Sequence, residues 1–166
     1  MTVRRNRISL NEVSKLLRYD PITGLFYWIT KRNGTTTKNS AGHAGKYIRI
    51  KIAGKMYSAS CLAWLFMTGV WPEHEVDHAD LDKHNNRWNN LRAATRQQNT
   101  RNVPKREGKS SSYKGVWWHA WSGKWESKIC YGGRQNSLGR FDTEEEAYAA
   151  YCAAAKKHHG EFARTS

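Results

Sequence analysis

The stretch EVDHADLDKHNNRWNNLRAATRQQN, residues 75–99, gathers Asp, His and Asn side chains in an order suited to phosphate chemistry. Cleavage of a phosphodiester needs a hard divalent cation, which prefers oxygen ligands such as a carboxylate and an amide carbonyl. It also needs a general base with a pKa of about 7, and histidine is the natural choice. Asp77 and Asn99 are therefore candidate metal ligands, and His78 is the candidate base.

The order of these residues predicts a strand, a loop and a helix that folds back. Asp77 and His78 are neighbours, and neighbouring side chains on an extended strand point to opposite faces. A local twist or bulge is expected if both serve one site. Asn99 lies in a polar segment consistent with a helix that returns it to Asp77. Asn90 is expected to hold the loop through side-chain hydrogen bonds to the backbone.

The residues alone leave another interpretation of this segment open. Asp80 and Asp82 can belong to a solvated turn, with Asp77 capping a helix. A calcium-binding EF-hand is excluded, because the Gly at its sixth loop position and the Glu at its twelfth are missing. His84 is expected to face solvent, and Asp80 and Asp82 are expected to cap or turn the chain rather than bind metal.

The run VDHADLDKHNNRWNNLRAATRQQNTRN resembles the ββα-metal motif of HNH endonucleases. More narrowly, it resembles the phage and intron-encoded homing type, in which Asn replaces the last His. The resemblance covers about residues 10–102. It implies that His78 is the general base and that Asp77 and Asn99 are the metal ligands. It also implies that Asn90 is the central Asn that holds the loop.

Upstream of this segment the apolar pattern predicts a small mixed core. Helical spacing, alternation and turn residues define the expected elements. In chain order they are a helix at Leu10–Arg18, a turn at 20–24, a strand at Leu25–Ile29, strands at Tyr47–Ile52 and Met56–Ala59, and a helix at Ser60–Thr68 that ends before Gly69 and Pro72.

After residue 102 the pattern changes. VPKREGKSSS, residues 103–112, combines Pro, Gly, a Ser run and four charges, which is typical of a flexible linker. Short strands are expected at Tyr113–Trp118, Lys124–Tyr131 and Gln135–Leu138, followed by a helix at Glu144–His158. Asp142 is the expected cap of this helix, with Glu145 as its partner in a capping box.

Residues 113–163 resemble an AP2 domain on the strength of YKGV, GKW, LGRFDTEEEA and HGEFA. The resemblance implies a three-stranded sheet on one helix, with the outer face of the sheet in the major groove of DNA. Plant members carry several Arg on the first strands, where this chain has other residues, so guanine readout by bidentate Arg is not expected. The alternative is that Trp117, Trp118 and Trp125 only pack the module. The expected DNA contacts are Lys114, Trp117, His119, Trp125, Lys128 and Arg134.

Composition supports a polyanionic partner. The chain has 28 Lys and Arg against 14 Asp and Glu, a formal net charge of +14 at pH 7. Nucleic acid is the first candidate partner. An anionic membrane surface is less favoured, because no apolar run is long enough to cross a bilayer and no signal peptide is evident. The basic residues expected to grip DNA from the first domain are Arg4, Arg5, Arg7, Lys46, Arg49, Lys51 and Arg87.

The three cysteines, Cys61, Cys130 and Cys152, form no CxxC pair and are odd in number. They argue against a disulfide framework and against a cysteine-built zinc site. A reducing cytoplasm is therefore the expected location, that of the host cell if the gene is carried by a phage. Cys61 departs from the HNH resemblance, which leads one to expect His or another polar residue there.

Taken together, the sequence predicts an α+β fold, in which a ββα-metal HNH nuclease domain precedes a small AP2-like domain of three strands and one helix. The expected boundaries are 1–102, a basic linker at 103–112, and 113–166. The expected function is metal-dependent hydrolysis of double-stranded DNA by a monomer that nicks one strand, with Mg²⁺ as the ion and Mn²⁺ as an alternative. The alternatives are a catalytically inactive, sequence-specific DNA-binding regulator and an RNA-interaction protein.

Overall fold

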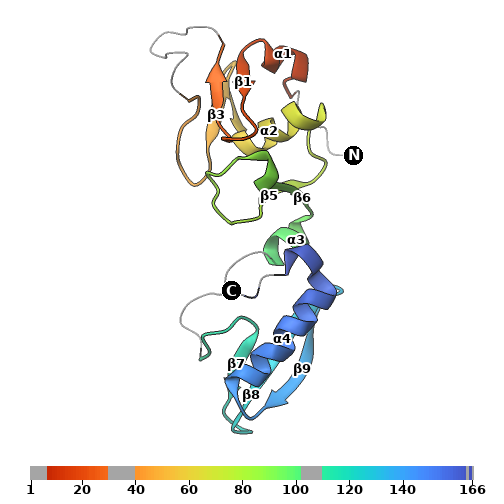
Figure 1. Ribbon diagram of the computed structural model, residues 1–166. Helices are drawn as coiled ribbons and strands as arrows, with labels where there is room; N and C mark the ends of the chain where they lie inside the picture. Colours follow the sequence, from red (N-terminus) through yellow and green to blue (C-terminus); the bar gives the residue numbers. More distant parts are fainter. Residues whose placement is uncertain (1–6, 30–39, 102–109, 164, 166) are drawn as a thin grey trace. The chain divides into compact units, whose positions relative to one another are not determined.

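The computed structural model describes residues 7–29, 40–101, 110–163 and 165 (Figure 1). The chain divides into two compact units, Met1–Thr95 and Arg96–Ser166. The predicted DNA contacts Arg4 and Arg5 and most of the predicted linker lie outside the described residues. The finer division at 1–102, 103–112 and 113–166 stays a prediction. Within the described residues, no helix has the length and apolar character required to cross a membrane.

The first unit begins with a short helix and a hairpin. Helix α1 (Leu10–Ser14) starts at a capping box formed by Ser9 and Glu12. Strands β1 (Leu17–Tyr19) and β2 (Phe26–Trp28) then pair antiparallel. The predicted helix to Arg18 is therefore wrong in its second half. The turn at residues 20–24 reverses the chain, and pairing with β2 places Leu17 fully inside the core, so the hairpin prevails over the helical spacing.

A second hairpin and the main helix follow in the predicted order, with their starts shifted by one or two residues and Ala59 in the helix rather than in the strand. Strands β3 (Arg49–Ile52) and β4 (Lys55–Ser58) pair antiparallel. Helix α2 (Ala59–Thr68) begins directly after β4 and ends at Gly69. On β3 the apolar side chains alternate inward, with Ile50 and Ile52 at most 1% exposed. The exposed partners on the same strand are therefore available to contact solvent or a ligand.

The segment that carries the candidate chemistry forms a third antiparallel pair. Strand β5 (Glu75–His78) runs beside β6 (Leu91–Ala94), and the loop between them ends in a 3₁₀ turn, η1 (Trp88–Asn90). Helix α3 (Arg96–Arg101) follows β6 and is the first element of the second unit. The register places Asp77 opposite Arg92 and His78 opposite Leu91.

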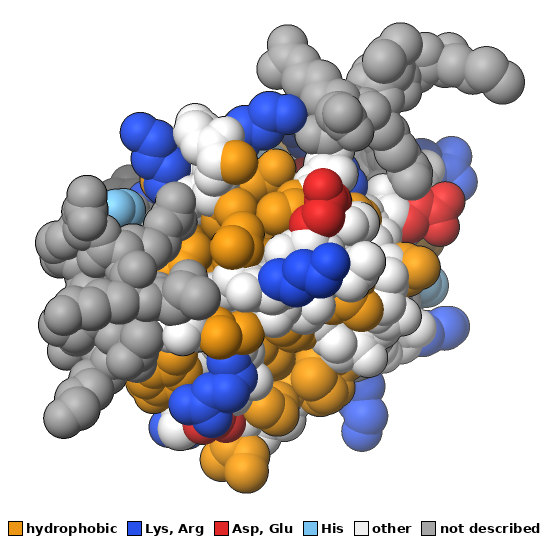
Figure 2. Space-filling view, turned by 90° about the horizontal axis from the view of Figure 1, so that it is seen from above, with side chains coloured by type: hydrophobic (Ala, Val, Ile, Leu, Met, Phe, Trp, Pro, Cys, Tyr) orange, Lys and Arg blue, Asp and Glu red, His pale blue; other side chains and the backbone are white. Residues whose placement is uncertain are grey.

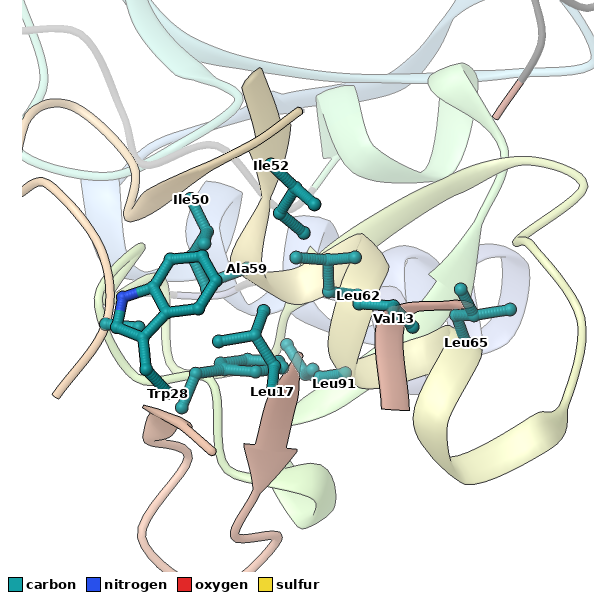
Figure 3. Packing of buried hydrophobic residues seen from close by; sticks show 12 residues of the cluster. Val13, Leu17, Trp28, Ile50, Ile52, Ala59, Leu62, Leu65 and Leu91 are labelled. Atoms are coloured by element: carbon teal, nitrogen blue, oxygen red, sulfur yellow. The ribbon is translucent and has the colours of Figure 1, made fainter. Parts of the chain in front are cut away.

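One hydrophobic core holds these elements of the first unit together. Figure 3 shows side chains converging from both hairpins, both helices and β6. The buried members are Val13, Leu17, Phe26, Trp28, Ala41, Ile50, Ile52, Ala59, Leu62, Ala63, Leu65 and Leu91. Because Leu91 is the cross-strand neighbour of His78, the candidate site is fixed directly to this core.

The second unit is a three-stranded antiparallel sheet covered on one face by a helix (Figure 1). The strands are β7 (Val116–His119), β8 (Lys124–Tyr131) and β9 (Arg134–Phe141), in the order β7-β8-β9. The helix is α4 (Glu144–His159), and a 3₁₀ turn, η2 (Gly160–Phe162), follows it. The predicted strand at Lys124–Tyr131 is confirmed. β7 starts three residues later than predicted, and β9 extends further at both ends, because it pairs with β8 from Trp125 to Tyr131.

The close approach of α4 to the sheet depends on Gly115, which precedes β7. Its φ is +76°, and a Cβ there would lie 2.2 Å from the ring of Tyr151 on α4. Tyr151 and Ala155 of the helix pack with Ile129 of β8 as the centre of this core. Gly115 is therefore required both for its backbone conformation and for the space that it leaves.

The cap of α4 differs from the prediction by one residue. Thr143, not Asp142, is the N-cap, and it forms a capping box with Glu146. Asp142 instead forms an ion pair with Lys124, with 2.9 Å between Oδ1 and Nζ. The prediction of Asp142 with Glu145 is therefore wrong by one residue at both positions of the capping box. Glu144 on the first turn accepts hydrogen bonds from Ser111 and Ser112 and so holds the end of the predicted linker against the N-terminus of α4.

Candidate functional site

Asp77 and His78 lie side by side on β5, and both are only 4% exposed. Oδ2 of Asp77 accepts hydrogen bonds from Arg92 Nε at 3.0 Å and Nη2 at 2.9 Å. Arg92 lies directly opposite Asp77 on β6, so the antiparallel register creates this ion pair. A buried carboxylate is costly without a cation close by, and the guanidinium meets that need.

The ring of His78 is held on the loop side of β5. Its Nε2 lies 3.2 Å from Oδ1 of Asn86, which is 3% exposed. The ring of Tyr47 lies beside it, with 6.5 Å between the ring centroids. The candidate base is therefore buried against an amide and an aromatic ring.

Asn90 closes the loop between β5 and β6. Its Oδ1 accepts from the backbone N–H of Asp80 at 3.0 Å, and its Nδ2 donates to the carbonyl of Asn85 at 2.8 Å. The same Nδ2 lies 2.8 Å from Oδ1 of Asp80. The side-chain hydrogen bonds to backbone expected of Asn90 are present. Its importance for catalysis stays a prediction.

The two acidic residues of the loop accept hydrogen bonds from its backbone and so stabilise its turns. Asp80 Oδ1 accepts from the N–H of Asp82, and Asp82 Oδ1 accepts from the N–H of His84. Desolvation raises the pKa of Asp80, but hydrogen bonds from Asn85, Asn90 and the Asp82 backbone outweigh it, so the pKa is lowered overall. His84 is exposed as predicted, and its Nε2 lies 2.6 Å from the carbonyl oxygen of Gly45.

The turn of the first hairpin supports this loop from outside. Tyr19 donates from its hydroxyl to the carbonyl of Asn86 at 2.7 Å. The N–H of Trp88 donates to the carbonyl of Pro21 at 3.0 Å. At Gly24, with φ +75°, a Cβ would lie 2.4 Å from the backbone N of Arg87. The turn at residues 20–24 and the loop at residues 86–88 are therefore in direct backbone contact.

Three residues of this arrangement have no role in the sequence prediction, namely Tyr19, Asn86 and Arg92. Arg92 follows from the register once β5 and β6 are known to pair. Asn86 stands in the quoted motif, but only the contact with His78 gives it a function. Tyr19 carries no local signal, because its contact with Asn86 joins distant parts of the sequence.

Of the two predicted metal ligands, only Asp77 lies in the first unit. Asn99 lies on α3, which belongs to the second unit, so its role as a ligand stays a prediction. Among the described residues, no cluster of three or more His, Cys, Asp or Glu side chains is placed to hold a metal ion. One carboxylate and one amide oxygen nevertheless suit Mg²⁺, which usually keeps several waters and binds substrate phosphate.

The predicted cations of the first unit lie on its surface. Arg49 and Lys51 are exposed on β3, and Arg87 is exposed at the start of η1. Arg7 and Lys46 are exposed as well, and the guanidinium of Arg7 lies 5.2 Å from the ring centroid of Trp71. On the face seen in Figure 2, Lys and Arg side chains stand apart from one another around hydrophobic surface.

In the second unit the sheet face opposite α4 gathers several predicted DNA contacts. Trp117, His119 and Lys128 share this outer face by the strand register. Lys128 Nζ lies 4.7 Å from the ring centroid of Trp117 and 3.1 Å from Oε1 of Glu126. Arg140 of β9 reaches His119, with 3.4 Å between Nη2 and Nε2.

The other predicted contacts of this unit lie elsewhere. Trp125 pairs with Trp118 on the face that carries Val116, so the structure does not bring it together with Trp117. Lys114 precedes β7, and Arg134 is exposed at the start of β9. Trp121, between β7 and β8, is 90% exposed and is not among the predicted contacts.

Among known proteins, the chain is similar to two AP2-like transcription factors of a plant. The chain is 48% identical over 52 residues to the AP2-like ethylene-responsive transcription factor TOE2 of Arabidopsis thaliana, covering 31% of this chain and 11% of that protein. It is 26% identical over 136 residues to the AP2-like ethylene-responsive transcription factor PLT2 of the same plant, covering 78% of this chain and 23% of that protein. The chain thus spans less than a quarter of the length of either relative.

Two family models match separate parts of the chain. One, described as HNH endonuclease, matches residues 57–101, from the end of β4 through the loop to α3. The other, described as AP2 domain, matches residues 111–161, which span the three-stranded sheet and α4. The chain therefore carries an HNH endonuclease domain followed by an AP2 DNA-binding domain.

Proposed function

We propose that this protein is a metal-dependent endonuclease that hydrolyses phosphodiester bonds in double-stranded DNA. The observation that carries the proposal is the buried pair of Asp77 and His78 at the end of β5, next to a loop closed by Asn90. This pair lies in the segment that matches the HNH endonuclease family. A separate AP2 domain would hold the DNA.

The proposed chemistry rests on the groups in the site and, for the identity of the products, on the resemblance to HNH endonucleases. His78 takes a proton from a water molecule, and the resulting hydroxide attacks the phosphorus. The bond from phosphorus to the 3′ oxygen breaks, which leaves a 5′-phosphate and a 3′-hydroxyl once the leaving oxygen gains a proton from water. Asp77 and Asn99 would hold a divalent cation, Mg²⁺ or alternatively Mn²⁺, which stabilises the charge that develops on the phosphate and the leaving oxygen.

DNA binding would use both domains. The net charge of +14 favours contact with phosphates. In the AP2 domain, the outer face with Trp117, His119 and Lys128 is the proposed contact, and the names of two relatives as transcription factors support it. Arg49, Lys51 and Arg87 would hold the duplex at the nuclease domain.

The biological setting belongs to the same proposal. One HNH site in a monomer would nick one strand, as in homing enzymes of phages and introns. Such an enzyme would work in the cytoplasm, that of the host cell if a phage encodes it. The resemblance of residues 76–102 to the homing type supports this proposal.

The test is nicking of supercoiled plasmid at low salt in Mg²⁺ or Mn²⁺, with EDTA as the metal-free control. Wild type should produce open circles only with metal, and His78→Ala should be slower by about 10²–10⁴-fold. His74→Ala is the matched control, because His74 is exposed just before the same strand. Equal nicking rates for wild type and His78→Ala would contradict the assignment of His78 as the general base.

A second candidate, a DNA-binding regulator without nuclease activity, is favoured by one observation. Asp77 already has a cation beside it, the guanidinium of Arg92 at 2.9 Å. If this pair persists in the presence of Mg²⁺, the protein would bind DNA and not cut it. A library of random duplexes separates the two functions, because selected binding without any metal-dependent cleavage of the selected sequences would support the regulator.

A further inference from the structure

Asn86 occupies a buried position between the candidate base and its own loop. Its side-chain Nδ2 lies 3.1 Å from the carbonyl oxygen of His84, and its Oδ1 lies 3.2 Å from Nε2 of His78. A backbone carbonyl can only accept a hydrogen bond, so it must face the NH₂ group of the amide. The orientation of the Asn86 amide is therefore fixed, with its oxygen toward His78.

That orientation determines which nitrogen of His78 carries the proton. An amide oxygen only accepts, so Nε2 of His78 must be the donor. In a neutral imidazole one nitrogen donates and the other holds a lone pair. The lone pair of neutral His78 is therefore on Nδ1.

The first hairpin keeps Asn86 in place. Its carbonyl oxygen accepts from the hydroxyl of Tyr19 at 2.7 Å, and its backbone N–H donates to the carbonyl of His84 at 3.0 Å. Gly24 lies so close that an added Cβ would be 2.5 Å from the carbonyl carbon of Asn86. Both the backbone and the side chain of Asn86 are thus held before any substrate arrives.

We propose that Asn86 is a positioning residue for His78, which fixes the proton on Nε2 so that Nδ1 takes the proton from the attacking water. As the ring becomes positively charged, its Nε2–H bond to Asn86 becomes charge-assisted and stronger. Asn86 thus acts through His78 and touches neither water nor phosphate. The role of Nδ1 rests on the proposed nuclease function, whereas the tautomer does not.

The first test reads the tautomer directly and needs no cleavage. Long-range ¹H–¹⁵N NMR of the full chain should show the proton of the neutral His78 imidazole on Nε2. Asn86→Ala should lose this preference. Asn86→Asp should retain it, because one carboxylate oxygen still accepts from Nε2–H, although the other loses the hydrogen bond to the carbonyl of His84. Wild type with its proton on Nδ1, or an unchanged tautomer in Asn86→Ala, would overturn the proposal.

The second test links the tautomer to catalysis. Plasmid nicking by Asn86→Ala should show a kcat lower by about 10–100-fold with an unchanged KM, as is typical when the partner that orients a functional histidine is lost. Asn86→Asp should recover part of that loss. Asn89→Ala is the matched control, because Asn89 is exposed in the same loop.

The two tests separate the possible failures. If wild type nicks DNA but its His78 proton is on Nδ1, the positioning role is wrong and the nuclease function stands. If no DNA is cut while the tautomer follows Asn86 as expected, the nuclease function fails and the role of Asn86 is confined to holding the ring. A normal ¹H–¹⁵N spectrum of each variant shows that it has folded.

Discussion

Asp77 is placed by its cross-strand neighbour as much as by its own strand. Its side chain is 6% exposed, and that of Arg92 is 18% exposed. The sequence made Asp77, His78 and Asn90 visible as candidates, because their residue types and order suit phosphate cleavage. It did not reveal Arg92 or Asn86 as partners, because those contacts depend on the register of β5 and β6 and on the course of the loop.

Replacement of Arg92 by Gln should destabilise the first unit by about 3 kcal/mol in EDTA, since it leaves a buried carboxylate without its cation. Mg²⁺ should restore more stability to the variant than it adds to wild type, because a bound ion replaces the missing charge. Thermal unfolding with and without Mg²⁺ measures both effects. A variant as stable as wild type in EDTA would show that the ion pair contributes little.

The lowered pKa of Asp80 predicts an acid sensitivity of the loop. A carboxyl whose pKa is depressed on folding stabilises the fold above its ordinary value of 3.8, and this stability is lost as the pH falls through the folded value. Asp80→Asn should therefore be less stable than wild type at neutral pH and should lose less further stability in acid. Urea unfolding at several pH values tests this, and parallel curves for the two proteins would contradict it.

Among the elements, the first hairpin departs most from the prediction and matters most to the site. Helical spacing continues through Leu16 and Leu17, so a helix to Arg18 was a reasonable expectation. The hydrogen bonds of β1 to β2 are contacts between residues apart in sequence, which local periodicity does not register. By contrast, α2, β3 and β8 were predictable, because alternation or a long apolar face marks them locally.

Alanine substitutions at two glycines measure how much free energy of unfolding depends on the contact between this hairpin and the loop. Gly24 and Gly54 have φ of +75° and +79°, but an added Cβ meets backbone atoms only at Gly24. Gly54→Ala should cost only the backbone strain, about 1 kcal/mol. Gly24→Ala should cost about 3 kcal/mol, because overpacking adds to that strain, and it should reduce nicking by displacing Asn86. Urea unfolding gives both values, and equal losses would mean that the contact is loose.

At the scale of the whole molecule, the two units have separate hydrophobic cores, and the proposed function would assign cutting to the first and DNA binding to the second. The AP2 domain was predictable in outline, because its turn glycines and the acidic start and basic end of α4 are strong local signals. The sequence did not predict which tryptophans share a face of the sheet. The pairing of β7 with β8 places Trp117 and Trp125 on opposite faces.

DNA affinity of the full chain should fall steeply with salt, because binding by a chain of charge +14 releases counterions from the phosphates. Lys128→Ala should lower the slope of log affinity against log salt by about one, if Lys128 contacts a phosphate. Lys157→Ala is the control, since Lys157 is exposed on α4, on the covered side of the sheet. Fluorescence anisotropy over a salt series measures both, and equal slopes would move the contact away from the outer face.

The hydrogen bond between Tyr19 and Asn86 also bears on the order of events during folding. It joins residues 67 positions apart, and the bond from Trp71 to the carbonyl of Ile8 spans 63. Such distant contacts close only after the chain between them has been made, and they slow folding relative to local contacts. A nascent chain must therefore include Asn86 before the contact that holds the ring of His78 can form. Until translation has passed that point, the growing polypeptide has no assembled candidate site.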